Sequence, residues 1–290
     1  MTQDALALEG MPRRLFQATP SKLATWLDCP RRYRMTYLDR PQLPKGPPWA
    51  HNSVGAGAHN ALRDWLMLPA EQRTAEAAAR LADRHFLRDG FRDDAQAEEW
   101  RERTRAMVVG YASTVDPELE PVGLERTVST RTDCLALSGR VDRIDDRDGE
   151  LVIVDYKTGR SRLTDNDARS SLALAIYAVA ASRTLRKPCV RVELHHLPTG
   201  EVLAWEHSEE TLARQIRRAD AIGVEAQAAE QQVKDGAPAD DTLFPPNPGS
   251  MCAWCDFVQH CPEGRAAATP KKSWDGLAGI DPLPLPSDPI

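Results

Sequence analysis

The chain has 290 residues, of which 41% are hydrophobic and 28% are charged, and its formal net charge is −6. This length and apolar content suffice for a large core, in one elaborated domain or two small ones. No apolar run could span a bilayer and the N-terminus lacks a secretory signal pattern, so we expect a cytoplasmic protein without a membrane partner. Six cysteines in that compartment favour metal binding or buried thiols over disulfides.

The charges are unevenly distributed along the chain. Residues 1–50 carry eight Lys and Arg against four Asp and Glu, and residues 169–191 carry five basic residues and no acidic one. Residues 209–241 carry eight acidic residues against four basic ones. A basic face opposite an acidic face is compatible with phosphate binding, although ordinary solvated helix faces would give the same counts.

The N-terminal half is predicted to be helical. Residues 1–18 show no clear period and are expected to be flexible. Thr19 and Pro20 form a typical helix start, with a capping hydroxyl followed by proline at the first helical position. Helices are predicted at residues 19–28, 31–38, 52–68, 71–88 and 96–115, with a proline-rich loop at 40–50.

The C-terminal half is predicted to supply the sheet. Strands are predicted near residues 121–131, 133–142, 150–157, 189–197 and 201–207, and helices at 166–186 and 209–232. Residues 266–290 are rich in Pro, Ala, Gly and Asp and are expected to form a disordered tail. This order of elements predicts an α/β fold with an N-terminal helical layer.

Two carboxylates and an amine are predicted to meet within GRVDRID…LVIVDYKTG, residues 139–159. Asp155 and Lys157 lie two residues apart on one strand, so their side chains leave the same face. A hairpin turn at Asp148-Gly149 would bring Asp142 toward them from the preceding strand. Paired carboxylates bind Mg²⁺ or Mn²⁺, and a nearby ammonium can orient water or stabilise charge on a phosphate. The set suits metal-assisted phosphodiester hydrolysis.

An Asp-x-Lys pair by itself is more often a surface salt bridge than a catalytic pair. Here the run from Leu151 to Val154 is apolar on both faces, as expected for a central strand. A charged pair at the end of such a strand carries a desolvation cost, which favours a functional role.

His59 is predicted to lie on a helix, one turn after Gly55. A single histidine on a helix is more often a packing residue than a ligand. The small residues 55–58 would let this helix approach a sheet closely. If it docks beside the acidic strands, the imidazole becomes a further metal ligand.

Three cysteines form a second cluster, Cys252-x2-Cys255-x5-Cys261, in a segment that resembles a loop. Three thiolates at this spacing can surround one metal centre, and Cys29 is the natural fourth ligand. Such a site would close a ring of more than 200 residues, which restricts the unfolded chain by roughly 4–5 kcal/mol. The spacing alone leaves zinc and an iron–sulfur cluster open.

Six motifs lie in one order between residues 19 and 262. They are SKLATWLDCPRRYR (21–34), GAGAH (55–59), GRVDRID (139–145), VDYKTG (154–159), LALAIY (172–177) and CAWCDFVQHC (252–261). Together they resemble the RecB-type PD-(D/E)XK nucleases, in the iron–sulfur branch that includes the AddB nuclease domain and the RecB-like CRISPR-associated exonucleases. The resemblance implies a restriction-endonuclease-like domain at 19–265, with a central mixed sheet flanked by helices, an N-terminal helical layer and a C-terminal cysteine-rich segment.

The resemblance also implies roles for single residues. His59, Asp142 and Asp155 match metal-binding positions, the backbone carbonyl of Tyr156 is a further ligand, and Lys157 matches the catalytic lysine. The [4Fe–4S] ligands implied are Cys29, Cys252, Cys255 and Cys261, with structural Zn²⁺ as the alternative. Tyr177 matches a tyrosine near the DNA, and Ala173 stands where many relatives have Gln.

The resulting hypothesis is a Mg²⁺- or Mn²⁺-dependent DNA nuclease, most simply an exonuclease of DNA repair or recombination. Its substrate would be DNA that is single-stranded or has a free end, with Arg31, Arg32 and Arg34 contacting backbone phosphates. One alternative is a non-catalytic, nuclease-like DNA-binding subunit of a helicase–nuclease complex. No Walker-type loop is present, so a helicase motor would be a separate chain. Another alternative is a zinc-stabilised structural protein.

Overall fold

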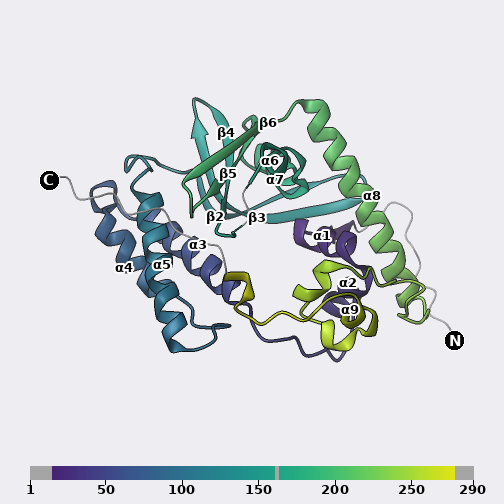
Figure 1. The fold of residues 1–290 in the computed structure, drawn as a ribbon. Helices are drawn as coiled ribbons and strands as arrows, with labels where there is room; N and C mark the ends of the chain where they lie inside the picture. Colours follow the sequence, from purple (N-terminus) through teal and green to yellow (C-terminus); the bar gives the residue numbers. More distant parts are fainter. Residues whose placement is uncertain (1–14, 161–162, 278–290) are drawn as a thin grey trace.

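The computed structural model describes residues 15–160 and 163–277, which form a mixed sheet with helices on both faces (Figure 1). The six-stranded sheet has the order β1-β3-β4-β5-β6, with β2 paired to β3. The strands are β1 Phe16–Ala18, β2 Gly123–Arg131, β3 Leu135–Arg147, β4 Glu150–Lys157, β5 Cys189–His196 and β6 Glu201–Glu206. β1–β3 and β4–β5 are parallel pairs and the others are antiparallel. The predicted fold class is confirmed.

The helices divide between the two faces of this sheet. One group packs against the apolar side chains of β4 and comprises α3 Ala50–Leu66, α4 Ala75–His85 and α5 Asp94–Ala112. On the other face are α1 Pro20–Asp28, α2 Pro30–Tyr37, α6 Asp165–Ser170, α7 Leu172–Leu185 and α8 Glu209–Lys234. The C-terminal segment holds η2 Ser250–Trp254, η3 Val258–His260, α9 Pro262–Ala267 and η4 Asp275–Leu277, and η1 Ala70–Gln72 precedes α4.

Local sequence explains where the N-terminal helices begin. Thr19 is extended and its hydroxyl accepts the amide N–H of Lys22, while Pro20 occupies the first turn of α1. Pro30 plays the same part in α2 after the extended residue Cys29. The N-terminal helical layer is therefore present as predicted, with α1 beside α8 and α2 beside α9 (Figure 1).

The predicted hairpin between β3 and β4 is confirmed, but its first strand is longer than expected. Asp148 and Gly149 have φ of 55° and 89°, the left-handed conformations that a tight hairpin turn requires. β3 runs on to Arg147, so Asp142 lies inside the strand and not at its end. The reason is that residues 143–147 pair with β4 and continue the ladder.

The single helix predicted at 166–186 is wrong. The chain forms α6 and α7, separated at Ser171, whose backbone is extended and whose hydroxyl accepts the amide N–H of Leu174. Serine competes with the helix for backbone hydrogen bonds, which explains the break.

The expected flexible ends are also shorter than predicted. Residues 16–18 form β1, because Phe16 and Ala18 are buried against β3. Near the other end, Leu277 is buried against the core beside α3, and the carbonyl of Ser273 accepts the amide N–H of Ala50. The rest of the predicted segments, 1–14 and 278–290, lies outside the described residues.

Candidate active site

The register of the sheet places the two predicted aspartates next to each other. Arg143 pairs with Val154, so Asp142 and Asp155 follow at adjacent positions where that ladder ends. The amide N–H of Tyr156 donates to Asp142 Oδ2 at 2.8 Å. This bond fixes the Asp142 carboxylate on the β4 side and leaves Oδ1 for other partners.

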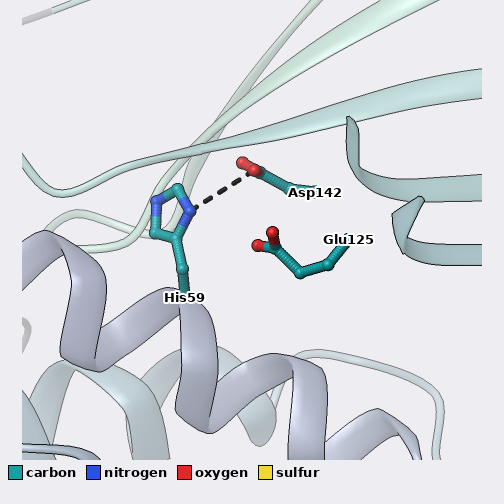
Figure 2. A group of neighbouring side chains, drawn as sticks. All are labelled: His59, Glu125 and Asp142. Carbon is teal, nitrogen blue, oxygen red and sulfur yellow. Dashed lines mark ion pairs between the residues drawn. The ribbon is translucent and has the colours of Figure 1, made fainter. Parts of the chain in front are cut away.

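The third predicted ligand comes from α3 on the opposite side of the site. His59 Nδ1 lies 3.4 Å from Asp142 Oδ1 (Figure 2). The His59 ring lies edge-on to the Tyr156 ring, with the two centroids 5.6 Å apart. α3 can approach because Gly55 has no side chain: a Cβ there would lie 3.2 Å from Thr158 Oγ1. The structure thus joins residues 59 and 142, as expected.

Glu125 on β2 completes a group that the sequence reasoning missed. Across the described residues, His59, Glu125 and Asp142 are the one set of three or more potential metal ligands whose donor atoms all lie within 4.8 Å of one another. Figure 2 shows the three side chains converging from α3 and two neighbouring strands. Leu124 pairs with Arg143 and Arg126 with Val141, so Glu125 stands directly across from Asp142.

The backbone at Glu125 has an uncommon conformation for a strand residue. Its φ is 46°, in the left-handed region that non-glycine residues rarely adopt. Such backbone strain is most often kept at functional sites. The sequence carried one usable signal: once Asp142 is chosen, antiparallel pairing points to an acidic residue on the strand before it.

Asp155 and Lys157 lie beside this group as an ion pair. The distance from Lys157 Nζ to Asp155 Oδ2 is 2.5 Å. Burial raises the pKa of Asp155, Lys157 lowers it and the charge of Asp142 raises it again, with a net increase. Side chains two residues apart on a strand share a face, and this places the Lys157 amine next to the Asp155 carboxylate.

Two of the three converging side chains, His59 and Glu125, have raised pKa values. Burial lowers the pKa of His59, but the hydrogen bond and charge of Asp142, with Asp155 and Glu125, raise it overall. Burial and then the charge of Asp142 raise the pKa of Glu125. Packed carboxylates with no cation between them behave this way, and two carboxylates plus an imidazole form a donor set that fits Mg²⁺ or Mn²⁺.

The site opens into a cleft of about 690 Å³. Its walls come from the start of α1, from α3, from β2 to β4 and from α7. Tyr177 lies in the wall against Gly139, and burial followed by the charges of Asp155 and Asp142 raises the pKa of Tyr177 to about 12. A cleft of this size leaves room for a substrate over the carboxylates.

A buried polar network lies behind the Tyr156 ring. Arg143, 3% exposed, donates to the hydroxyls of Tyr111 at 3.1 Å and Tyr156 at 3.3 Å. The Tyr111 hydroxyl is 2.7 Å from His195 Nδ1, whose other nitrogen is 2.9 Å from Glu193. These hydrogen bonds fix Tyr156, and with it β4, the strand that carries Asp155 and Lys157.

Two of the three arginines predicted to contact DNA have other roles. Arg31 is 5% exposed and forms ion pairs with Asp241 and Glu263, while its Nη1 is 3.2 Å from Cys261 Sγ. Arg34 pairs with Asp39 and donates to a backbone carbonyl. These partners lie far along the chain or in a turn that the sequence pattern did not reveal, and the DNA contacts of Arg31 and Arg34 stay a prediction. Arg32 remains half-exposed, with Asp28 at 3.6 Å.

The four cysteines of the second cluster meet around one small cavity of about 50 Å³, lined by Cys29, Cys252, Cys255 and Cys261. Backbone N–H groups of Asn247 and Gly264 point at the sulfurs of Cys29 and Cys261, at 3.4 and 3.3 Å. All six cysteines are free, as expected. Cys29 and Cys252, which are more than 200 positions apart in the sequence, thus line the same cavity.

A comparison with known proteins identifies the class. The family model of the PD-(D/E)XK nuclease superfamily matches residues 17–262, so the chain belongs to this superfamily, whose members are hydrolytic nucleases. Among solved structures, SSO0001 is similar at 13% identity, with a TM-score of 0.37 over 88% of this chain and 90% of that chain. A candidate exonuclease from Eubacterium rectale is similar at 8% identity, with a TM-score of 0.45 over 79% of this chain and 87% of that one. No curated protein matches the sequence.

Within the ranges 15–160 and 163–277, no helix is both long and apolar enough to cross a membrane.

Proposed function

We propose that this protein is a metal-dependent DNA nuclease, acting as an exonuclease on DNA that is single-stranded or has a free end. The observation that carries the proposal is the convergence of His59, Glu125 and Asp142 beside the Lys157 amine in an open cleft. The class of the fold supports the same reaction, because the superfamily consists of nucleases.

The chain's own residues have distinct parts in this reaction. His59 Nδ1 and the carboxylates of Glu125 and Asp142 would hold Mg²⁺ or Mn²⁺, and Asp155 with the Tyr156 carbonyl are proposed as further ligands. When bound, the cation lowers the pKa of a water and neutralises phosphate charge. Lys157 is oriented by Asp155 and stabilises negative charge that develops on the scissile phosphate. The bond from Tyr156 N–H keeps the Asp142 carboxylate aligned throughout.

We propose a [4Fe–4S] cluster at Cys29, Cys252, Cys255 and Cys261. Four thiolate-capable residues around one cavity, with backbone N–H groups directed at two sulfurs, form a donor set that suits such a cluster. Structural Zn²⁺ bound by the same four cysteines is the alternative.

The nuclease proposal is tested with end-labelled single- and double-stranded DNA in Mg²⁺, Mn²⁺ or EDTA. We expect cleavage with either cation and none in EDTA, and the label reports the polarity. DNA binding without cleavage under every condition would instead identify a non-catalytic DNA-binding subunit. A brown preparation that bleaches on reduction supports the cluster, whereas a colourless anaerobic preparation containing zinc contradicts it.

By analogy with the nucleases it resembles, we place the protein in DNA repair or recombination in the cytoplasm. A helicase partner, where one is used, would be a separate chain. Co-purification from a native extract checks this assignment, and a repair-proficient deletion strain would contradict it.

A further inference from the structure

A second hollow continues the active-site cleft toward the cysteine segment. It has a volume of about 460 Å³ and shares His51, Asn52 and Gly159 with the wall of the cleft. The two hollows are therefore adjacent, and a polymer lying across the candidate metal site would have the second hollow next to it. We call this hollow, with Trp49, His51 and Trp254 in its wall, the aromatic groove.

Three rings from two distant parts of the chain form one cluster in this groove. The centroids of Trp49 and Trp254 are 5.2 Å apart, and His51 lies 5.7 Å from Trp254 and 5.9 Å from Trp49. Trp49 precedes α3, His51 is in its first turn, and Trp254 stands between Cys252 and Cys255. All three rings are half-buried, so each still shows part of its surface to the groove.

The rings are held in place from behind. Trp49 Nε1 donates to Asp256 at 3.0 Å, and Gly276 lies so close to the His51 ring that a Cβ there would clash. A fixed aromatic surface loses little conformational freedom when a flat ligand stacks on it. Met251, 70% exposed, adds apolar surface at the rim, and Arg32 adds a positive charge.

A purely structural role would be to fasten the C-terminal segment to α3. Rings with that role alone belong in the core, as Trp65 does at 2% exposure, and not in the wall of an open hollow. Aromatic surface with a nearby arginine is the combination that binds single-stranded nucleic acid, because unpaired bases offer free faces for stacking. Bases in a duplex are stacked on one another and cannot use it.

We propose that the aromatic groove binds single-stranded DNA, with unpaired bases stacking on Trp254 and its two neighbouring rings, and that it leads the strand into the candidate metal site. The inference rests on the proposed function for the identity of the ligand. It also gives the cysteine segment a role beyond stability, since that segment places Trp254 in the wall.

The test is a binding titration in EDTA, with a fluorescent single-stranded oligonucleotide and an abasic oligonucleotide of the same length. Stacking predicts that Trp254→Ala binds the base-containing strand about tenfold more weakly and leaves abasic binding unchanged. Trp254→Phe should retain most of the affinity, because it keeps a ring. Trp205→Ala, on β6 beside Arg169 and outside the groove, is the matched control and should bind like the wild type.

Two further outcomes keep the inference separate from the nuclease proposal. Equal affinity of Trp254→Ala and wild type for the base-containing strand overturns the groove even if DNA is cleaved. Wild type that cleaves nothing but shows the ring-dependent binding supports the groove and overturns the nuclease. If Trp254→Ala does not fold, His51→Ala is measured in its place, with at least a threefold loss expected and no loss counting against the groove.

Discussion

Asp142 is the residue on which the candidate site depends most. One carboxylate oxygen accepts the Tyr156 N–H, the other faces His59, and Glu125 stands across the strand pair. Among the described residues, Lys157 is the one lysine whose amine forms an ion pair with a carboxylate of this site, that of Asp155. Substitutions at these two positions therefore separate chemistry from folding.

We expect Asp142→Asn and Lys157→Ala to abolish DNA cleavage in both Mg²⁺ and Mn²⁺, a loss of at least 100-fold. Both side chains are partly exposed to the cleft, so the unfolding midpoint should stay within a few degrees of wild type. A nuclease assay and a thermal melt on each variant check this. Wild-type cleavage by either variant in Mn²⁺ would remove that residue from the mechanism.

Manganese affinity should rise with pH, and Glu125 should contribute to that rise. The pKa values of His59, Glu125 and Asp155 are all raised in the metal-free protein, and a cation needs their deprotonated forms. Protons therefore compete with Mn²⁺ for the carboxylates at pH values above their ordinary pKa of about 4. They compete for His59 at pH values above the ordinary histidine pKa of about 6.5. Calorimetric titration at several pH values should show affinity falling as the pH is lowered.

Glu125→Gln should weaken Mn²⁺ binding by about tenfold and flatten its pH dependence, because one donor and one competing proton are lost. Glu120→Gln, on an exposed side chain that pairs with Arg73, serves as the control. Identical titrations for Glu125→Gln and wild type would show that Glu125 is not a ligand.

At this scale, residue type and spacing predicted Asp142, Asp155 and Lys157 as a group, and the resemblance to known nucleases added His59. Local pattern can do this because Asp155 and Lys157 share a strand and a short hairpin precedes them. Glu125 could not be found in the same way, because its place depends on cross-strand register and on a left-handed backbone. The acidic partners of Arg31 could not be found from local pattern either, since they are 210 and 232 residues further along.

At the scale of elements, the contact between β3 and α7 places Tyr177 in the cleft. Gly139 makes that contact possible, since a Cβ on this residue would lie only 2.4 Å from Cε1 of the Tyr177 ring. The sequence predicted both elements but not their spacing. It also missed the break at Ser171, which lets α7 begin afresh with its own cap.

Gly139→Ala should destabilise the fold by about 1–3 kcal/mol, because the Tyr177 ring must move out of a packed wall. Gly110→Ala is the matched control: Gly110 lies inside α5 with no atom near the position of a Cβ. Alanine there should stabilise the protein by about 0.5–1 kcal/mol through helix propensity. Denaturant titrations measure both, and equal stability of the two variants would show that the ring swings away freely.

Considering the molecule as a whole, the cysteine cavity ties the first helices to the last described segment. Cys252→Ala should cost up to about 4–5 kcal/mol, because a bound centre would no longer close the long loop. Cys134→Ala, half-buried and outside that cavity, should cost about 1 kcal/mol. Unfolding midpoints measured on freshly purified protein compare the two, and equal midpoints would contradict the stapling role.

The overall α/β architecture was predictable because its strands and helices carry strong local patterns. The ends of the domain were not, because composition alone suggested disorder there. Phe16, Trp274 and Leu277 lie in segments with few apolar residues, and they pack into clusters formed mainly by distant parts of the chain. Hydrophobicity averaged over a window of sequence conceals such single buried residues.

The packing of α2 against residues of α8 and α9 has a consequence for synthesis on the ribosome. The fully buried Tyr33 donates its hydroxyl hydrogen to Glu230, and Arg31 forms an ion pair with Glu263. During synthesis these partners of α2 are therefore added long after α2 itself. At a synthesis rate of about 5–20 residues per second, α1 and α2 spend roughly 10–50 s without these partners. During that interval α1 and α2 expose apolar surface, which makes nascent chains of this protein candidate clients for chaperones.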